Sequence, residues 1–301
     1  MHISYDVIGL GIASHDLIGV PSEEPRIGAK QSLSRWYEVG GGPVATALVT
    51  LARLGARVAM HGATGDDGYG AKIIAELQRE GVDTAAMQIH PGGSHVAMIL
   101  AEPGRDRRTI FWHNDRAVLD ALTLDRALLG STRALALDTH LGSVAIEAAQ
   151  IMGAAGGLVM IDAERLRDQT LELLPHCHVQ IVSEHFARQV TGEQDLFTAA
   201  RALHARYGQL AVVTGGAQGS WVVGRGAAFH CPAIAVEVVD TTGAGDVYHG
   251  AFLYGLLQGW ALERVARFAS VVAGLKCRAL GGRAGIPRLA EAEQLMLDGG
   301  H

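Results

Sequence analysis

The sequence VVDTTGAGDVYHGAF, residues 238–252, joins two acids, two threonines and three small residues to an apolar run. The overlapping segment VEVVD, residues 236–240, is rich in β-branched residues and therefore predicts a strand. GDVYHGAFLYGLLQG, residues 245–259, has the apolar spacing of a helix. We therefore expect a turn between a strand and a helix at the small residues.

Gly243, Ala244 and Gly245 occupy this turn. The first N–H groups of a helix have no partner inside it, and these residues carry no bulky side chain that could cover them. Such a turn predicts an anion site, most naturally for a phosphate. Asp246 follows, and an acid beside a phosphate would repel it unless it accepted a proton from a hydroxyl that attacks the phosphate. The alternative is that Asp246 only stabilises the helix N-terminus.

The composition bounds the class of protein. A chain of 301 residues is long enough for one large α/β domain, or for a domain with a small appendage. Its 49% hydrophobic and 19% charged residues are typical of a compact, soluble protein rather than a disordered one. A formal net charge of −6 and the lack of Lys or Arg runs argue against a nucleic-acid partner.

The cysteines and the N-terminus indicate the compartment. Cys177, Cys231 and Cys277 are scattered without metal-type spacing, and an odd, sparse count predicts reduced thiols in a cytosol. The start MHISYDVIGLG lacks the basic and apolar parts of a signal peptide. Because no apolar run reaches the roughly 18 residues that span a bilayer, we expect a cytoplasmic protein without a membrane partner.

Strand-like apolar runs alternate with helical patterns along most of the chain. The predicted strands are YDVIGLGIA, ARVAMHGATG, LALDTH, GLVMIDA, VQIVSE and QLAVVTGG; the predicted helices are ATALVTLARLG, YGAKIIAELQREG, SVAIEAAQIMGAAG and DLFTAARALHARYG. Gly81 is expected to close the second of these helices. Strands separated by helices predict an α/β fold with a parallel sheet and helices on both of its faces.

Two stretches break this alternation. Residues 17–38 are polar and irregular, whereas residues 94–115 predict two strands joined by a turn at Pro103 and Gly104. Both stretches fall early in the chain, and together they predict a small β-sheet lid over one edge of the main sheet. The alternative is a plain surface hairpin.

DTTGAGDVYHGAF, residues 240–252, resembles the C-terminal signature of the PfkB, or ribokinase-like, family of sugar kinases. In that signature an Asp-Thr-x-Gly-Ala-Gly-Asp core carries the anion hole and the catalytic base. The resemblance therefore implies that Gly243, Ala244 and Gly245 form the anion hole. It also implies that Asp246 is the base.

The same resemblance implies the fold. It predicts a ribokinase-like three-layer sandwich with a mostly parallel central sheet and a small β-sheet lid. Residues 1–301 are expected to form a single kinase domain, in which residues 17–38 and 94–115 make the lid. Relatives often pair their lids, so the resemblance also implies a homodimer through the lid.

A second family signature lies near the N-terminus. VGGGPVATALVTLARLG, residues 39–55, resembles the Gly-Gly segment that contacts the sugar and opens the first helix, which implies sugar contacts for Gly41 and Gly42. Their alternative is a tight turn into a helix. Thr46 stands where the family usually has a sugar-binding Asn. Asp16, expected at the end of the first strand, falls at the place of the family's sugar-binding Asp, where open sheets collect ligands; its alternative is a loop cap.

The nucleotide side rests on the resemblance alone. AVVTGGAQGSWV resembles the family's nucleotide strand and turn, which places Thr214, Gly216 and Gly219 beside the ATP phosphates and ribose. RFASVVAGLKCRALGGRAGIP resembles the segment that walls the adenine pocket, and Ala273 is its candidate contact. Ordinary helix packing is the alternative for Ala273.

ATP and Mg²⁺ are the implied cofactors, and a monovalent cation stays open. Relatives commonly organise the metal ion with an Asn-x-x-Glu motif near IVSEHFARQVTG, and the usual Asn and Glu are absent here. Asp162 and Glu184 are the candidates for this role. Either could equally be a solvated surface acid.

In detail the chain is similar to the branch that contains 6-deoxy-6-sulfofructose kinases, through EVGGGP, VVDTTGAGDV, LKC and GGRAGIP. LSRW and RTI also resemble ketohexokinases, and both branches imply a ketose in its furanose form. Lys30 falls at the Lys of the sulfonate pocket, Trp112 at its Asn and His140 at its Arg. One Lys without the forked Arg is a weaker anion site, so a neutral sugar stays open.

The sequence thus predicts ATP-dependent phosphorylation of the primary hydroxyl of a small-molecule sugar, with Arg108 and Lys30 arriving from the lid. Another PfkB-type sugar or nucleoside kinase and a catalytically silent sugar sensor are the alternatives. A dinucleotide oxidoreductase is disfavoured because Ser14 replaces the third glycine after GLG and no helix follows. No Walker-type motif occurs.

Overall fold

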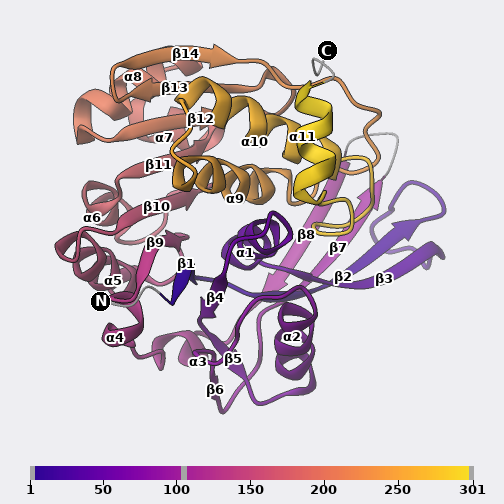
Figure 1. Ribbon diagram of the computed structural model, residues 1–301. Coiled ribbons are helices and arrows are strands. Elements are labelled where there is room, and N and C mark those ends of the chain that lie inside the picture. Colours follow the sequence, from indigo (N-terminus) through magenta and orange to yellow (C-terminus); the bar gives the residue numbers. More distant parts are fainter. Residues whose placement is uncertain (1–3, 103–106, 298–301) are drawn as a thin grey trace.

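An eight-stranded sheet forms the centre of the fold in the computed structural model, which describes residues 4–102 and 107–297 (Figure 1). Its strands, in spatial order, are β14 (Ala227–Cys231), β13 (Ser220–Gly224), β12 (Leu210–Thr214), β11 (Val179–Ser183), β10 (Leu158–Ala163), β9 (Thr132–Leu137), β1 (Tyr5–Leu10) and β4 (Val58–His61). Neighbours from β12 to β4 pair in parallel, whereas β13 and β14 are antiparallel additions at one edge. The predicted, mostly parallel sheet is confirmed.

The parallel strands are buried on both faces, which is why they read as continuous apolar runs. In β11, Val179 to Val182 are all buried. Gln180 is the polar residue among these four, and its side-chain NH2 group donates to the Leu174 carbonyl at 2.9 Å. The strands therefore carry their polar groups at their carboxyl ends, where a site can form.

Helices cover both faces of the sheet and complete three layers (Figure 1). One apolar core joins the sheet to α1 (Pro43–Arg53), α2 (Gly68–Arg79), α9 (Ala244–Leu257), α10 (Leu262–Lys276) and α11 (Leu289–Leu297). The other core joins it to α3 (Arg116–Asp120), α4 (Arg126–Leu129), α5 (Gly142–Ala154), α6 (Thr170–Leu173), η1 (Leu174–His176), α7 (Glu184–Thr191) and α8 (Leu196–Tyr207). The five helices predicted by spacing are α1, α2, α5, α8 and α9. Gly81, with φ 80°, follows α2 as expected.

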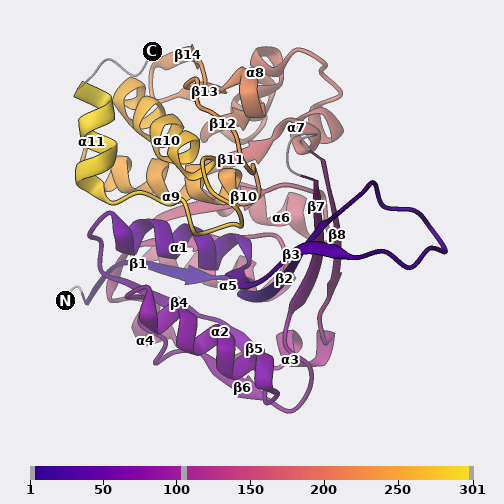
Figure 2. The same cartoon turned by 90° about the vertical axis from the view of Figure 1, so that its right-hand side faces the viewer.

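A second, four-stranded sheet stands apart from the first. Its order is β3 (Leu33–Gly41), β2 (Ser14–Pro21), β7 (Val96–Glu102) and β8 (Arg107–His113). The two predicted stretches therefore do pair, and the part predicted as irregular forms β2, β3 and their connection. Figure 2 shows this connection projecting away from the body of the molecule. The predicted turn at Pro103 and Gly104 lies outside the described residues.

Smaller elements complete the chain. β5 (Ala63–Gly65) and β6 (Gln88–His90) form a two-stranded parallel sheet, and η2 (Gly216–Gln218) follows β12. Among the helices of the described residues, none has the length and apolar character needed to cross a bilayer.

Two expectations about local structure were wrong. Residues 236–240 form no strand, and the chain bends at Val239; the N–H groups of Val239 and Asp240 donate to the Cys277 carbonyl at 2.8 and 3.1 Å. β-branched residues fit an extended backbone, but they do not provide a partner strand. Asp16 lies within β2 of the small sheet, not at the end of β1, because the chain after β1 continues into the second sheet.

Candidate active site

The turn into α9 has an open N-terminus. Gly243 caps the helix with φ 74° and ψ 4°, and a Cβ there would lie 2.9 Å from the backbone of Gly282. Only glycine suits that conformation and that contact. A Cβ at Gly245 would meet no atom within 4 Å. The space in front of the first helical turn is therefore free.

The N–H groups of this turn differ in their engagement. The Ala244 N–H donates to the Thr241 carbonyl at 3.1 Å, so it is not a free donor and the predicted three-donor hole is corrected at this position. Within the residues that the structure describes, the N–H groups of Gly243 and Gly245 have no acceptor in the protein. Two bare donors at the positive end of a 14-residue helix suit an anion.

Hydrogen bonds to Asp240 hold the loop that precedes the turn. Asp240 accepts hydrogen bonds from the Thr242 N–H at 2.9 Å and from the Gly281 N–H at 2.8 Å. The fully buried Lys276 donates its ammonium group to the Asp240 carbonyl at 2.8 Å. Burial lowers the pKa of Lys276, and Asp240 opposes that shift. This loop therefore already contains a fixed ammonium group, and the monovalent cation stays a prediction.

Asp246 lies in a cluster with Asp162 and His249. His249, one turn along α9, holds Asp162 at the end of β10, with 3.3 Å between its Nε2 and the Asp162 Oδ1. Its Nδ1 lies 2.5 Å from the Gly245 carbonyl. Burial, and then the charge of Asp162, raise the pKa of Asp246 to about 7. Burial also raises the pKa of Asp162. An acid with such a pKa is suited to exchange a proton near neutral pH.

This raised pKa predicts the pH dependence of the reaction. A general base acts in its ionised form, so activity is lost as the pH falls through the pKa of Asp246. We expect kcat/KM to fall about tenfold per pH unit below about pH 7, which steady-state rates between pH 5 and 9 would measure. A kcat/KM that stays constant down to pH 5 would contradict this assignment of the base.

The two glycines of the turn provide a matched pair of variants. Gly243→Ala is expected to destabilise the protein by about 1 kcal/mol or more, because it forces a side chain into a left-handed backbone against Gly282. Gly245→Ala meets open space and should leave the unfolding free energy within about 0.5 kcal/mol of the parent. Urea unfolding of both variants is the measurement. Equal stability of the two would show that the turn is not held as described.

The residues predicted to contact the sugar gather at the junction of the two larger sheets. Asp16 is buried, accepts from the Ser14 hydroxyl at 2.7 Å, and would lie 2.1 Å from a Cβ on Gly41. Gly41 therefore has to be glycine so that the carboxylate can approach the backbone. Burial is the main cause of a raised Asp16 pKa, against the effects of Ser14 and Arg283. Gly42 caps α1.

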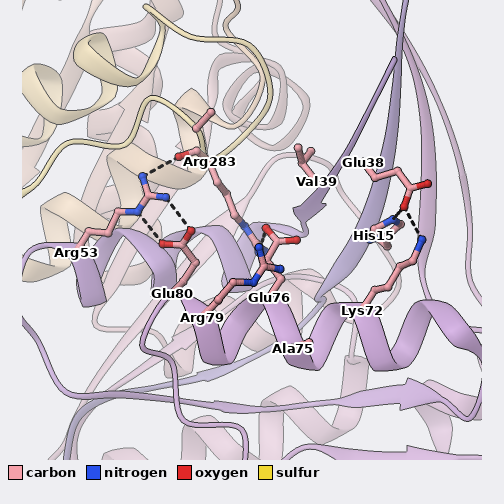
Figure 3. Close-up of a pocket in the computed structure, with 11 residues that line it drawn as sticks. His15, Glu38, Val39, Arg53, Lys72, Ala75, Glu76, Arg79, Glu80 and Arg283 are labelled. Atoms are coloured by element: carbon pink, nitrogen blue, oxygen red, sulfur yellow. Dashed lines mark hydrogen bonds and ion pairs between the residues drawn. The ribbon is translucent and has the colours of Figure 1, made fainter. Parts of the chain in front are cut away.

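Thr46 and Arg283 correct the predicted sugar contacts. Thr46 is 1% exposed, and its hydroxyl accepts from the Arg283 Nε at 3.3 Å, so it faces a buried guanidinium instead of an open cleft. Arg283 also donates to the Gly41 carbonyl at 2.6 Å and lies 3.3 Å from Glu76 (Figure 3). The sequence analysis did not predict a role for Arg283. The only sign of one in the sequence is that a cation lies among the glycines of GGRAGIP.

Figure 3 also shows the pocket behind this arginine. It lies between α2, the small sheet and the segment that carries Arg283, and its charged lining residues include Arg53, Glu80, Lys72 and Glu38. Arg53 is paired with Glu80, and Lys72 with Glu38. The lining contains none of the residues predicted for the site, and its charges are largely satisfied within the protein.

The residues predicted for the lid and for the sulfonate pocket lie on several segments. The Arg108 guanidinium of β8 donates to the Thr241 hydroxyl at 2.9 Å, which places it beside the turn at Gly243. Lys30 is exposed on the connection between β2 and β3. The His140 Nδ1 lies 3.1 Å from Asp138, and Trp112 is half-exposed.

The predicted nucleotide and metal residues lie at the same end of the sheet or on α10. Thr214 ends β12 and donates to the Val182 carbonyl at 3.3 Å, while Gly216 begins the adjoining η2 turn and Gly219 caps its end. Ala273 packs on the core from α10. Glu184 forms a surface pair with Arg188 at 3.0 Å, so Asp162 is the better-placed acid. No group of three or more acids, His or Cys suited to a metal occurs among the described residues.

The comparisons with known proteins agree with this geometry. The model of the pfkB family carbohydrate kinases matches residues 6–289. The chain belongs to the PfkB family of carbohydrate kinases. Phosphoryl transfer to a sugar hydroxyl is therefore its enzyme class, as the resemblance of residues 240–252 implied.

Individual PfkB relatives cover nearly the whole chain. The ribokinase of Bacillus subtilis is 29% identical, over 95% of this chain and 98% of its own length. The 5-dehydro-2-deoxygluconokinase of Shouchella clausii is 26% identical, over 97% and 95% of the two chains. The chain is thus similar both to a ribokinase and to a kinase named for an acid sugar.

Solved PfkB structures confirm the ribokinase-like fold. A crystal structure of a putative ribokinase from Agrobacterium tumefaciens has a TM-score of 0.93 at 28% identity, covering 98% of each chain. A putative ribokinase II from E. coli, solved in complex with ATP and Mg²⁺, has a TM-score of 0.84 at 21% identity, covering 98% and 99%. The three-layer sandwich with a small separate sheet is therefore shared.

Proposed function

We propose that this PfkB kinase transfers the γ-phosphoryl group of ATP to a primary hydroxyl of a ketose-type sugar, either fructose-like or 6-deoxy-6-sulfofructose. One observation carries the proposal. Asp246, with its raised pKa, stands on the first turn of α9 beside the bare N–H groups of Gly243 and Gly245. A proton acceptor and an anion cradle in one place are what attack on a phosphate requires.

The residues divide the work of transfer. Asp246 accepts the proton of the attacking hydroxyl, a role worth about 10²–10⁴ in rate. Each free N–H group at the turn stabilises charge on the transferring group, at about 3–4 kcal/mol per donor. Asp162 is the acid that would help to hold Mg²⁺ when ATP is bound, and the ion would supply neutralisation of the phosphate charge. Thr214, Gly216, Gly219 and Ala273 are proposed to contact the nucleotide.

The sugar is proposed to lie between Asp246 and the small sheet. Asp16 accepts hydrogen bonds from its hydroxyls, while Gly41 and Gly42 offer a bare backbone. Arg283 holds the segment at Gly41 and Gly42 in place, because it donates hydrogen bonds to the Gly41 carbonyl and the Thr46 hydroxyl. Thr46 thus acts through Arg283 instead of touching the sugar.

Release of ADP in a coupled assay, over a panel of sugars with ATP and Mg²⁺, tests this function. Fructose, 6-deoxy-6-sulfofructose, ribose and a nucleoside are the members that separate the alternatives. The proposal expects a ketose to give the largest kcat/KM. A larger value for ribose or the nucleoside would overturn the ketose assignment, and tight sugar binding without ADP release would favour a sugar sensor.

We also propose that the small sheet is a lid and a dimer surface. Arg108 links the sheet to the anion-binding turn through Thr241, which is a contact that a closed lid makes.

The face of the small sheet opposite Arg108 is the proposed dimer surface. It carries Trp36, Met98 and Phe111, which are about half-exposed. Such an apolar face suits a second copy of this chain. Sedimentation of the protein tests this: a monomer at micromolar concentration would contradict it.

The organisation and the compartment stay proposals as well. We propose one kinase domain over residues 1–301, with the small sheet as its appendage. We also propose that the protein works in a reducing cytoplasm. This proposal is supported by its cysteines, because Cys177, Cys231 and Cys277 are all free and buried.

A further inference from the structure

A buried ammonium group holds the loop that leads into α9. Lys276, the last residue of α10, is fully buried, and its Nζ donates to the Asp240 carbonyl at 2.8 Å. Burial lowers the pKa of Lys276, whereas the charges of Asp240 and Asp246 favour its ionised form. A buried charge is costly unless it has a partner. The partner here is a backbone oxygen, which is the kind of group that also binds an alkali cation.

The oxygen atoms of this loop are already engaged within the protein. The Asp240 Oδ1 accepts from the Thr242 N–H at 2.9 Å and from its hydroxyl at 2.7 Å, and the Oδ2 accepts from the Gly281 N–H at 2.8 Å. The Cys277 carbonyl accepts from the N–H groups of Val239 and Asp240. An alkali cation needs several such oxygens in place of its hydration shell. The residues of this loop therefore do not fit a monovalent cation.

Charge repulsion acts in the same direction. A cation on the Asp240 carbonyl would share that oxygen with the Lys276 ammonium group. Two positive charges about 4 Å apart repel each other several times more strongly near a protein interior than in bulk water. The ammonium group therefore excludes a second cation from this loop.

The loop that Lys276 holds continues directly into the turn of the proposed active site. Thr241 follows Asp240, and its carbonyl accepts from the Ala244 N–H at 3.1 Å. Gly243, which caps α9, comes two residues after Thr241. A shift of the Asp240 carbonyl would thus move the backbone of the turn. Positive charge close to the turn also favours an anion on its N–H groups.

We propose that the Lys276 ammonium group takes the place of a bound monovalent cation in this kinase. Lys276 is a positioning residue: it holds the Asp240 loop, and with it the turn at Gly243, and it supplies positive charge beside them. Phosphoryl transfer therefore needs no K⁺ or related ion. This inference rests on the proposed role of the turn, and it holds for any sugar substrate.

Rates of the parent protein in different salts give the first test. ADP release with the most active sugar of the panel is measured with Mg²⁺ and the tetramethylammonium salt of ATP. The added salt is KCl, NaCl or tetramethylammonium chloride at one ionic strength, so that screening stays constant. We expect kcat/KM for ATP to differ less than about threefold among the three salts. A larger advantage of KCl or NaCl overturns the proposal, even if no variant of Lys276 folds.

Lys276→Ala removes the charge and leaves room for an ion beside the Asp240 carbonyl. In tetramethylammonium chloride we expect KM for ATP to rise about 10- to 100-fold, because the carbonyl loses its donor and the turn its support. KCl should then lower this KM by at least about fivefold. The loss of a merely structural contact would not depend on which cation is present. An equal KM for the variant in both salts therefore refutes the proposal.

Lys72→Ala is the matched control. The Lys72 ammonium group is about half-exposed and pairs with Glu38 on the surface. Its removal should change KM for ATP less than about twofold in either salt. A gain in KCl as large as that of Lys276→Ala would show that the response is not specific to Lys276, and would count against the proposal.

Melting temperatures judge Lys276 without sugar or turnover. The parent Tm should agree within about 1 °C between KCl and tetramethylammonium chloride, since no ion binds. Lys276→Ala should melt about 3–10 °C lower and regain at least about 2 °C in KCl, because an ion that binds only the folded state stabilises it. If no sugar releases ADP, the kinase proposal fails and this measurement still decides on Lys276. A larger KCl gain in the parent, or a smaller one in the variant, refutes the replacement.

Discussion

Asp246→Asn is expected to lower kcat by about 10²–10⁴ while ATP still binds with nearly its parent affinity. The amide cannot accept the proton of the attacking hydroxyl, but it keeps the shape of the side chain beside the bare N–H groups of Gly243 and Gly245. Coupled ADP release gives kcat, and calorimetric titration gives the nucleotide affinity. A variant within about threefold of the parent kcat would show that Asp246 is not the base.

Stability measurements check that this loss is chemical rather than structural. The folded-state pKa of Asp246 is raised above its ordinary value, so its ionised form destabilises the fold increasingly from about pH 4 to about pH 7 and fully above. Asp246→Asn should therefore have a Tm at pH 8 equal to or above that of the parent. Glu164→Gln removes an exposed neighbouring carboxylate and serves as the control, with kcat expected to change less than about threefold.

Arg283→Met is expected to destabilise the protein by about 3–5 kcal/mol. Arg283 is 4% exposed, and its removal leaves the Glu76 carboxylate and the Gly41 carbonyl buried without their donor. Urea unfolding measures the loss. Sugar KM should rise as well, because the Gly41 segment loses its support beneath Asp16.

Two further variants show whether the buried charge is the cause. Glu76→Gln in the Arg283→Met background should recover part of the loss, because it removes the unpaired carboxylate. Arg26→Met breaks an exposed pair with Glu23 and should change stability by less than about 1 kcal/mol. A loss below about 1 kcal/mol in Arg283→Met would contradict the role given to this guanidinium.

Features of the site that depend on one continuous segment could be predicted from the sequence. The turn at Gly243 to Gly245 and the helix that follows are local, because helix ends expose N–H groups whatever the rest of the fold does. The engagement of the Ala244 N–H with Thr241 could not be predicted, since it depends on the turn's exact backbone path. The strand expected at residues 236–240 failed for a related reason: it needs a partner that propensity does not provide.

Features that join distant segments were missed. Arg283 reaches Thr46 and Gly41 across more than 200 residues, and Lys276 reaches the Asp240 carbonyl from the far end of α10. The sequence pattern predicted His249 only as part of an apolar helix, although its side chain contacts Asp162 on strand β10. No spacing rule along the chain brings such pairs together, because the topology of the sheet determines them.

The resemblance to the family located residues better than it assigned their contacts. It placed Asp16 at the end of the first strand, but the strand that carries it belongs to the small sheet. Trp112 and His140 were predicted as a weakened anion pocket. The structure adds His95 and Arg167 beside Trp112, from segments that the sequence patterns did not connect with it.

Transfer of a radiolabelled γ-phosphate from ATP to sugar in a single turnover shows whether Asp246 is the proton acceptor. We expect labelled sugar phosphate from the parent protein, and a rate at least about 100-fold lower in Asp246→Asn at saturating ATP. Equal rates in the two proteins would contradict it, because a group other than the Asp246 carboxylate would then be accepting the proton.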